Sequence, residues 1–593
     1  MAMPASLSAL TPVERALVEH VESGKLLDLA GDAPIDETAM RSWDESRSVR
    51  AQVLRHIIRG RLAGDADPHG LRLRGARIAG RVDLENITST VALDLRYCLL
   101  SEGINARDAH LPAIILKGCR LSNSHEPALD AAGLSAAVFT CSETEITAHS
   151  NRGAIRLSSA HLDRLDCSGS KLHNDSGPAF DADSLHIEQE AFLRGGFEAI
   201  GSGNRAAVWL RAARIGGSLD CRHAMLRNDF GPALEARVIH IGHGMFLRRE
   251  FEAIGAGENG TICLRGGHID GTLDFEGAHL HNPSGPAIDA DGLQVGDNVT
   301  IDGGFKAVGA GERGTLIFNG GNFGAQLICT DATVCNSSGV ALSADRLQVE
   351  GNVSLQGELC LTGGGARVTA HLAGLRVGGF FLFSPKELTH RDPQRRLDVN
   401  GLVYSGLPKG IDTDSWLQIL REGTSEYAAQ PYQQLAAAHR AAGHDHEARR
   451  ILIEQRRAQL HRHALTGRGE RAWTRLTGLT LGYGYQPWRA LLGLLGVLVV
   501  ASALAAVLGK HGGLATVQTP GNTTTGRCTL VEYIGVGLDL GSPLISTGAR
   551  THCEYTNTTP GAILTVSGWI LRLLAWAFAT LFIAGFTGAV RKT

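Results

Sequence analysis

The feature that most constrains the fold of this chain is an internal repeat with a period of about 54 residues, found between positions 150 and 370. The tetrapeptides GPAF, GPAL, GPAI and GVAL begin at Gly177, Gly231, Gly285 and Gly339. A second marker, FEAIGSG and its close variants, recurs with the same period. A fixed period of this length indicates that one structural unit is stacked several times along the chain.

Each repeat contains four short apolar stretches separated by Gly, Asn, Asp and Pro. In one copy these are Thr261–Leu264, Thr272–Phe275, Ala287–Ala290 and Val299–Ile301. Apolar and polar residues alternate within them, which is typical of β-strands, and the glycines leave no stretch long enough for a helical solenoid. The spacing divides the repeat into two coils of about 26 to 28 residues. We therefore expect a mainly β fold, in which residues 70–405 form a parallel β-helix of roughly twelve coils, about 60 Å long.

The composition agrees with narrow coils. Gly accounts for 74 of the 593 residues, whereas aromatic residues make up only 5%. The corners of a coil need positive φ angles, which Gly adopts freely. The net charge of −3 excludes a general affinity for nucleic acid, so we expect no nucleic-acid partner.

Polar residues recur in phase with the repeat. Asn123, Asn174, Asn228, Asn282 and Asn336 follow one another at one repeat length, except that the first interval is slightly shorter. This spacing predicts a structural ladder of amides stacked inside a turn of the coils, as amides stack in cross-β assemblies.

Three carboxylates also align, at Asp166, Asp220 and Asp274. Such a row either faces solvent or, with His268 nearby, forms a polar face that binds a cation or performs acid–base chemistry. We favour the solvated row, because no cluster of Asp, His and Arg interrupts the repeat. The sequence thus predicts no catalytic residues and no metal site.

Two segments match the pattern GxGxxG, at Gly255–Gly260 and Gly309–Gly314. A dinucleotide-binding motif needs a helix directly after the glycines, and the repeat predicts strands there. Both segments share one phase of the repeat with a third copy at Gly201. We interpret them as turns of the coils and expect no cofactor.

Helical segments flank the coils. Residues 1–69 are expected to cap the solenoid, with one helix from the capping box at Thr11 to about Val21 and another over Asp44–Leu62. Residues 410–470 are expected to form a helical hairpin followed by a basic segment.

Residues 488–592 contain two apolar runs, Ala490–Leu508 and a second within Gly561–Val590. Their length and lack of charge predict two transmembrane helices joined by an outer loop over residues 510–560. Arg residues gather before the first run, and Arg591 and Lys592 follow the second. This distribution predicts that both termini lie in the cytoplasm of a bacterium and the anchor in its plasma membrane. The arginines expected to face anionic lipids of the inner leaflet are Arg456, Arg457, Arg462 and Arg468.

The cysteines agree with this topology. Nine of the eleven lie in the predicted cytoplasmic part and are expected to be reduced and mostly buried. The other two, Cys528 and Cys553, lie in the outer loop, where a disulfide between them is expected.

Several segments together resemble a known family. They are RAQVLRHIIRGRL, LRLRGARIAGRVDL, AAQPYQQLAAAHRAAGHDHEARRILI, GYGYQPWRA and SGWILRLLAWAFATLFIAGFTGAVRK. With this order, the chain resembles a family of uncharacterised actinobacterial, membrane-anchored, β-helix-like proteins. Some members carry the label "membrane-associated oxidoreductase". The resemblance implies a membrane-anchored β-helix and transfers no catalytic residue to this chain.

Three functions remain open at this point. The first is a membrane-tethered cytoplasmic scaffold that binds a protein partner or a second copy of itself, and we favour it. The second is a membrane-associated enzyme, either an oxidoreductase by the family label or a carbohydrate-active enzyme by analogy of fold. The third is a two-span channel or signalling module whose outer segment, Val531–Ile545, is either re-entrant or an outer cap.

Overall fold

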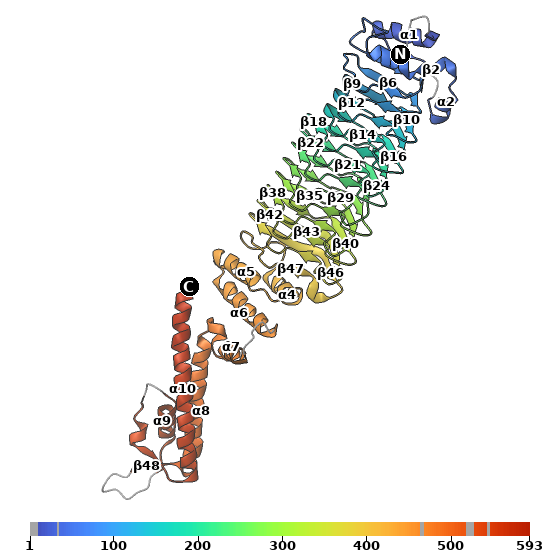
Figure 1. Ribbon diagram of the computed structural model, residues 1–593. Helices are drawn as coiled ribbons and strands as arrows, with labels where there is room; N and C mark the ends of the chain where they lie inside the picture. Colours follow the sequence, from blue (N-terminus) through green and yellow to red (C-terminus); the bar gives the residue numbers. More distant parts are fainter. Residues whose placement is uncertain (1–9, 32–34, 463–467, 518–526, 543–545, 593) are drawn as a thin grey trace. The chain divides into compact units, whose positions relative to one another are not determined.

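The computed structural model describes residues 10–31, 35–462, 468–517, 527–542 and 546–592. The chain divides into two compact units, Met1–Gln434 and Leu435–Thr593, which are described separately below. Figure 1 labels their helices and strands.

The first unit is a parallel β-solenoid, as the repeat predicts, with about 13 turns where roughly twelve were expected. One of its sheets stacks thirteen strands, from β5 (Val82–Asp83) to β47 (Leu397–Asp398), one from each coil. Ile262 pairs with Ile288, and Ile288 pairs with Leu316, so that a shorter coil is followed by a slightly longer one. One shorter and one longer coil therefore make up each repeat.

The remaining strands of each coil belong to a second, larger sheet. In one coil they are β30 (His268–Ile269), β31 (Leu273–Asp274) and β32 (His279–His281). Ile269, Leu273 and Leu280 point inward and are buried, and their counterparts in the other coils continue one apolar column through the solenoid. Alternate residues therefore point outward in rows, one residue per coil.

One corner of the coil uses the left-handed backbone conformation in every turn. The residue there lies three or four positions after the strand of the thirteen-stranded sheet and has φ between 52° and 80°. Six of these residues are Gly, as expected, but seven are not. The backbone N–H of the corner residue donates to a carbonyl of the next coil, for example from Val238 to Arg265, so pairing between coils imposes the conformation. The corner residues are Asn86, Asp108, Gly133, Ser159, Ser184, Ala212, Val238, Gly266, Gly292, Gly320, Arg346, Gly374 and Gly401.

Val238 is the most strained of these corner residues, because a β-branched side chain strongly disfavours its φ of 53°. Val238 is 63% exposed, so its side chain contributes little to packing. We expect Val238→Gly to stabilise the solenoid by about 1 kcal/mol, after the entropy of the added Gly is subtracted. Thermal unfolding should show a higher midpoint. Ala212→Gly at the same corner, with φ of 54°, should give a smaller rise. An unchanged or lower midpoint for Val238→Gly would contradict the strain argument.

The N-terminal end of the solenoid is covered as predicted, but with a different boundary. Helix α1 (Pro12–Glu22) begins with the expected capping box at Thr11. The second predicted helix, over Asp44–Leu62, is wrong in extent, because only α3 (Ala51–Ile58) is an α-helix. Before it, β2 (Ser48–Arg50) pairs with β4 (Arg77–Ala79), since Val49 is buried as part of the first rung of the sheet. The short elements of this cap are β1 (Leu27–Asp28), α2 (Glu37–Ser42) and the 3₁₀ turn Glu45–Arg47.

Aromatic side chains close the other end of the solenoid. Trp416 on α4 (Thr413–Glu422) is buried, and its ring centroid lies 5.4 Å from that of Phe383 on β46 (Phe381–His390). The side-chain amide of Gln430, at the start of α5 (Gln430–Ala441), donates to the carbonyl of Leu402. These contacts cover the last coil.

The second unit contains two helices that are long and apolar enough to span a membrane, over Trp488–Gly513 and Thr559–Ala584. Gly493 on α8 (Trp488–Leu508) faces the ring of Phe578 on α10 (Thr559–Lys592), so the two helices pack together. Large apolar side chains nevertheless remain outside, including Leu573, which is 73% exposed. The second of the two apolar windows includes Arg572. The helices of this unit are α6 (Asp445–His461), α7 (Arg468–Leu481), α8 (Trp488–Leu508), α9 (Leu530–Gly541) and α10 (Thr559–Lys592).

The segment between α8 and α10 is folded. Strands β48 (Leu514–Thr516) and β49 (Cys553–Tyr555) form an antiparallel pair. Helix α9 lies against α8, where a side chain on Gly537 would collide with the Cα of Ser502. A disulfide joins Cys528 to Cys553 and links the start of α9 to β49.

We expect the disulfide to stabilise this segment by about 3 kcal/mol, because it closes a 25-residue loop. Thermal unfolding in detergent should show a lower midpoint for a double variant with Cys528→Ser and Cys553→Ser. Reductant should lower the midpoint of the native chain and leave the double variant unchanged, since the other nine cysteines are free thiols. If reductant had equal effects on both proteins, the stabilising role would be wrong.

Candidate functional site

The asparagines of the repeat occupy one loop position but do not stack directly. Asn174, Asn228, Asn282 and Asn336 are buried, and Gly201 or Gly309 takes their place in intervening coils. In each case the amide binds the backbone of its own loop and of the preceding coil. Asn123, in the first copy, is only half-buried. The ladder therefore differs from a cross-β stack, because each amide bridges coils through backbone groups.

The predicted carboxylate row alternates with aromatic residues. Asp166 lies opposite Phe192, which lies opposite Asp220 in the next coil. Asp220 accepts hydrogen bonds from Arg194 (2.9 Å) and Arg222 (2.6 Å), and Arg194 also lies over the ring of Phe192. Asp274 accepts a bond of 2.6 Å from Arg248 in the same manner.

These pairings decide between the two interpretations of the row. Asp220 and Asp274 are buried beneath arginines, so a solvated row is wrong for both. Burial alone raises the pKa of Asp220, but the hydrogen bonds from Arg222 and Arg194 outweigh it and the net pKa lies below the usual value. A carboxylate already neutralised by two arginines is a poor cation ligand. Asp220 and Asp274 therefore serve the packing of the coils.

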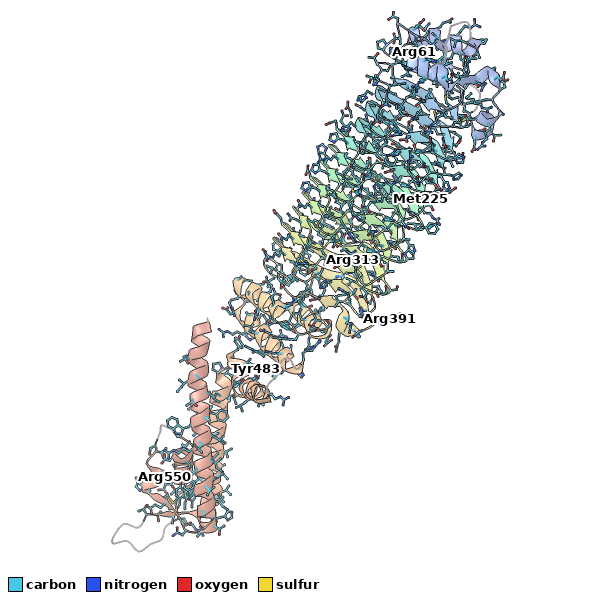
Figure 2. The ribbon with its side chains drawn as sticks, viewed as in Figure 1. Arg61, Met225, Arg313, Arg391, Tyr483 and Arg550 are labelled. Carbon is cyan, nitrogen blue, oxygen red and sulfur yellow. A yellow bond between two sulfur atoms is a disulfide. The ribbon has the colours of Figure 1, made fainter. Side chains whose placement is uncertain are left out.

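Sequence reasoning missed a second row of buried acids on the thirteen-stranded sheet. It includes Asp181, Glu235 and Asp289, which face outward and are at most 4% exposed. Arg313 on a neighbouring coil donates to Asp289 over 2.8 Å, and Figure 2 shows its side chain on this part of the solenoid. Burial raises the pKa of Asp181 and of Glu235 despite the adjacent arginines. The buried acids Asp220, Asp274 and Asp289 are thus bound by arginines of the same chain.

A third outward row was also missed, and it is rich in imidazole. We call it the histidine row. His161 pairs with His186, and His240 pairs with His268, on adjacent strands. The ring centroids of these pairs are 5.6 and 5.2 Å apart. The row consists of His110, Ser135, His161, His186, Arg214, His240, His268, Gln294, Asn322, Gln348 and Arg376.

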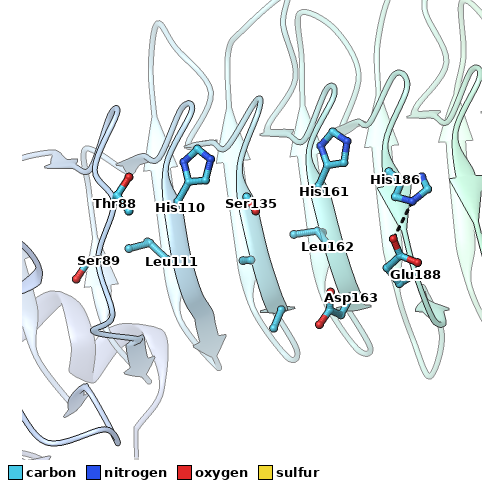
Figure 3. Close-up of a pocket in the computed structure, with 12 residues that line it drawn as sticks. Thr88, Ser89, His110, Leu111, Ser135, His161, Leu162, Asp163, His186 and Glu188 are labelled. Carbon is cyan, nitrogen blue, oxygen red and sulfur yellow. Dashed lines mark hydrogen bonds and ion pairs between the residues drawn. The ribbon is translucent and has the colours of Figure 1, made fainter.

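A hollow of about 340 Å³ lies on the N-terminal part of the histidine row (Figure 3). It forms where Ser135 and Ala137 are small, between the imidazoles of His110 and His161 on the neighbouring strands. Glu188 lies at one end of the hollow and binds the Nε2 of His186 over 3.1 Å. The hollow thus presents imidazole, hydroxyl and carboxylate groups on four parallel strands, β9 (His110–Lys117), β12 (Ser135–Thr140), β15 (His161–Asp166) and β18 (His186–Ile187).

These groups suit the binding of a polar surface. Imidazole donates and accepts hydrogen bonds, and Asp163 and Glu188 accept them. A nucleophilic mechanism would need a base within hydrogen-bond reach of the hydroxyl. Among the described residues, no hydrogen bond joins Ser135 to His110 or His161. The geometry supports binding through polar groups on several strands.

The glycine-rich segments lie in loops of the solenoid. Gly255–Gly260 connects β28 (Glu252–Ile254) to β29 (Ile262–Cys263), and the next element after the glycines is this strand, where a dinucleotide-binding motif has a helix. Gly309–Gly314 connects β36 (Phe305–Gly309) to β37 (Leu316–Ile317). This agrees with their interpretation as turns.

The basic segment near the apolar helices is partly described. On α6, the guanidinium of Arg456 is bonded to Gln459 and that of Arg457 to Glu454, 2.7 Å away. Arg462 follows the helix as its C-terminal cap. Arg468 begins α7, but its side chain lies outside the described residues. Lipid contact by these arginines stays a prediction.

Comparison with known proteins adds no constraint on the site. No protein-family model, curated protein or solved structure matches the chain.

Proposed function

We propose that this protein is a membrane-tethered scaffold that binds a protein partner through the hollow on the histidine row. The observation that carries the proposal is the contrast between the rows of the solenoid. The buried acids of two rows, such as Asp220 and Asp289, are bound by arginines of the same chain, whereas the hollow offers exposed imidazoles around small side chains. Several strands contribute to it, as a surface for a protein segment requires.

The tether is proposed to be the pair α8 and α10. Their exposed apolar side chains support insertion into lipid, because such a surface is unfavourable in water. The arginines before α8, together with Arg591 and Lys592 at the end of α10, support cytoplasmic termini, and the arginines on α6 support contact with anionic lipids of the inner leaflet. A reporter at the N-terminus that proved to lie outside the cell would contradict this topology.

Site-specific photo-crosslinking in native membranes tests the binding surface. A photoreactive residue at Ala137, in the hollow, should give an adduct of discrete mass. The same residue at Ala212, an exposed corner position outside the hollow, should not. Two differently tagged copies of the chain show whether the adduct contains a second copy. Absence of any adduct from Ala137, together with a monomer in mild detergent, would refute the scaffold.

A further inference from the structure

We infer that His240, His268 and Asp270 form a binding site for a divalent transition-metal ion such as Zn²⁺. The site lies on the histidine row but outside the hollow, and it does not depend on the proposed scaffold function. One ligand atom from each residue lies within 4.8 Å of the others. The sequence predicted no metal site, because the two imidazoles belong to different coils and meet only when one coil stacks on the next.

The backbone aligns the three side chains. His240 on β26 (His240–Ile241) pairs in register with His268, and the two rings stack with planes 11° apart. Asp270 follows His268 by two residues and shares its outward face. The three side chains are 45 to 48% exposed, so that an ion can reach them from solvent.

The distances fit a tetrahedral ion after small adjustments. Nε2 of His268 lies 2.8 Å from Oδ1 of Asp270, and Nε2 of His240 lies 3.8 Å from Oδ2 of the same carboxylate. Ligands bound to Zn²⁺ at about 2.0 to 2.1 Å in a tetrahedron lie about 3.3 Å apart. The two contacts involve different oxygens of the carboxylate, so one oxygen must turn toward both nitrogens. The two nitrogens, which lie within 4.8 Å of each other, must reach the same spacing by rotation of the exposed imidazoles. Two nitrogens and one carboxylate oxygen suit Zn²⁺, with a fourth position open to water.

A neighbouring amide orients one of the ligands. Nδ1 of His268 lies 3.1 Å from Oε1 of Gln294 in the next coil. With that nitrogen as the donor, the lone pair of Nε2 points toward the Asp270 carboxylate and is available to a metal ion. A hydrogen bond from the second ring nitrogen to an oxygen is the usual support for a metal-bound histidine. The amide thus directs the metal-binding nitrogen toward the carboxylate.

The same row contains a matched pair that lacks this geometry. His161 and His186 also lie on adjacent strands, and Glu188 follows His186 by two residues. Their rings are tilted by 45°, and only His186 contacts the carboxylate. This pair is a control for metal binding by exposed imidazoles in general.

Titration of the full-length, metal-stripped protein in detergent with Co²⁺ alone tests the site. The native chain should bind one more equivalent than His268→Ala or Asp270→Asn and should show the visible bands of four-coordinate Co²⁺. Zn²⁺ should abolish these bands. Gln294→Leu should keep the site but weaken it about tenfold. His186→Ala should bind as the native chain does.

Circular dichroism and gel filtration of each variant confirm that the fold is kept, and Asp270→Asn provides a conservative change if an alanine variant unfolds. The proposal is overturned if a double variant with His240→Ala and His268→Ala retains the stoichiometry and spectrum of the native chain. It is equally overturned if His186→Ala loses the same equivalent.

Discussion

Replacing Asn282 by Ala is expected to destabilise its coil by about 3 kcal/mol. The side chain is fully buried, and its Nδ2 donates to the carbonyls of Gly257 (3.1 Å) and Pro286 (2.7 Å). Its Oδ1 accepts from the backbone N–H groups of Ser284 (3.0 Å) and Gly285 (2.8 Å). Alanine leaves these backbone groups in a dry loop without partners, and each unsatisfied group costs more than a hydrogen bond contributes.

Hydrogen exchange in the full-length protein gives the sharpest measurement, because a long repeat opens locally. Amides of residues 255–290 should exchange about a hundredfold faster in the variant, as about 3 kcal/mol implies. Asn123→Ala is the matched control, since this Asn makes the same kinds of bonds in the first copy but is half-exposed. Water can replace the hydrogen bonds of its amide, so Asn123→Ala should destabilise its coil by only about 1 kcal/mol. Equal effects at the two positions would show that burial of the amide is unimportant.

Replacing Gly285 by Val is expected to be the most damaging single change in the repeat, at about 4 kcal/mol. A Cβ on Gly285 would lie 2.1 Å from the carbonyl oxygen of Gly257, which is backbone and cannot turn aside. The two loops must therefore separate. The same carbonyl accepts the hydrogen bond from Asn282, so the substitution also breaks the bridge between these coils.

The control for Gly285→Val is Gly266→Ala. Gly266 has φ of 62°, but a Cβ there would meet nothing within 4 Å. Gly266→Ala should therefore destabilise the solenoid only through the strain of the left-handed conformation, by about 1 kcal/mol. The full-length Gly285→Val variant should have a much lower midpoint of thermal unfolding than Gly266→Ala. It should also be cleaved faster in limited proteolysis. The reverse order would mean that close approach between loops does not limit this fold.

The solenoid could be predicted from sequence because stacking converts a linear period into spatial neighbours. GPAI and its relatives recur once in every repeat, and that constant period specifies two coils whatever the detailed path of each coil. The disulfide partners and the two apolar helices needed only local signals, at Cys528, Cys553 and the uncharged runs. The N-terminal cap was harder, since Val49 has helical spacing with its neighbours but pairs as a strand with Ile78.

The order of residues along each outward row could not be predicted, because it depends on which residues of adjacent coils lie opposite one another. The repeat groups Asp220 with Asp166 and Asp274, but Phe192 and Phe246 lie between them in the intervening coils. The histidine row left a fainter signal. The dipeptide His-Ile begins at His186, His240 and His268, but the alternation of shorter and longer coils hides its common position.

That alternation also determines how such a molecule can change in length. Odd and even coils differ in their loops, with Asn in one and Gly in the other, so a single inserted or deleted coil would bring two like loops together. Insertion or deletion of two coils together keeps an Asn loop next to a Gly loop at every contact between coils. The solenoid can therefore grow or shrink in steps of one repeat, about 10 Å each, with its outward rows preserved. Tandem duplication of a segment one repeat long gives a longer molecule of the same kind without any new contact having to evolve.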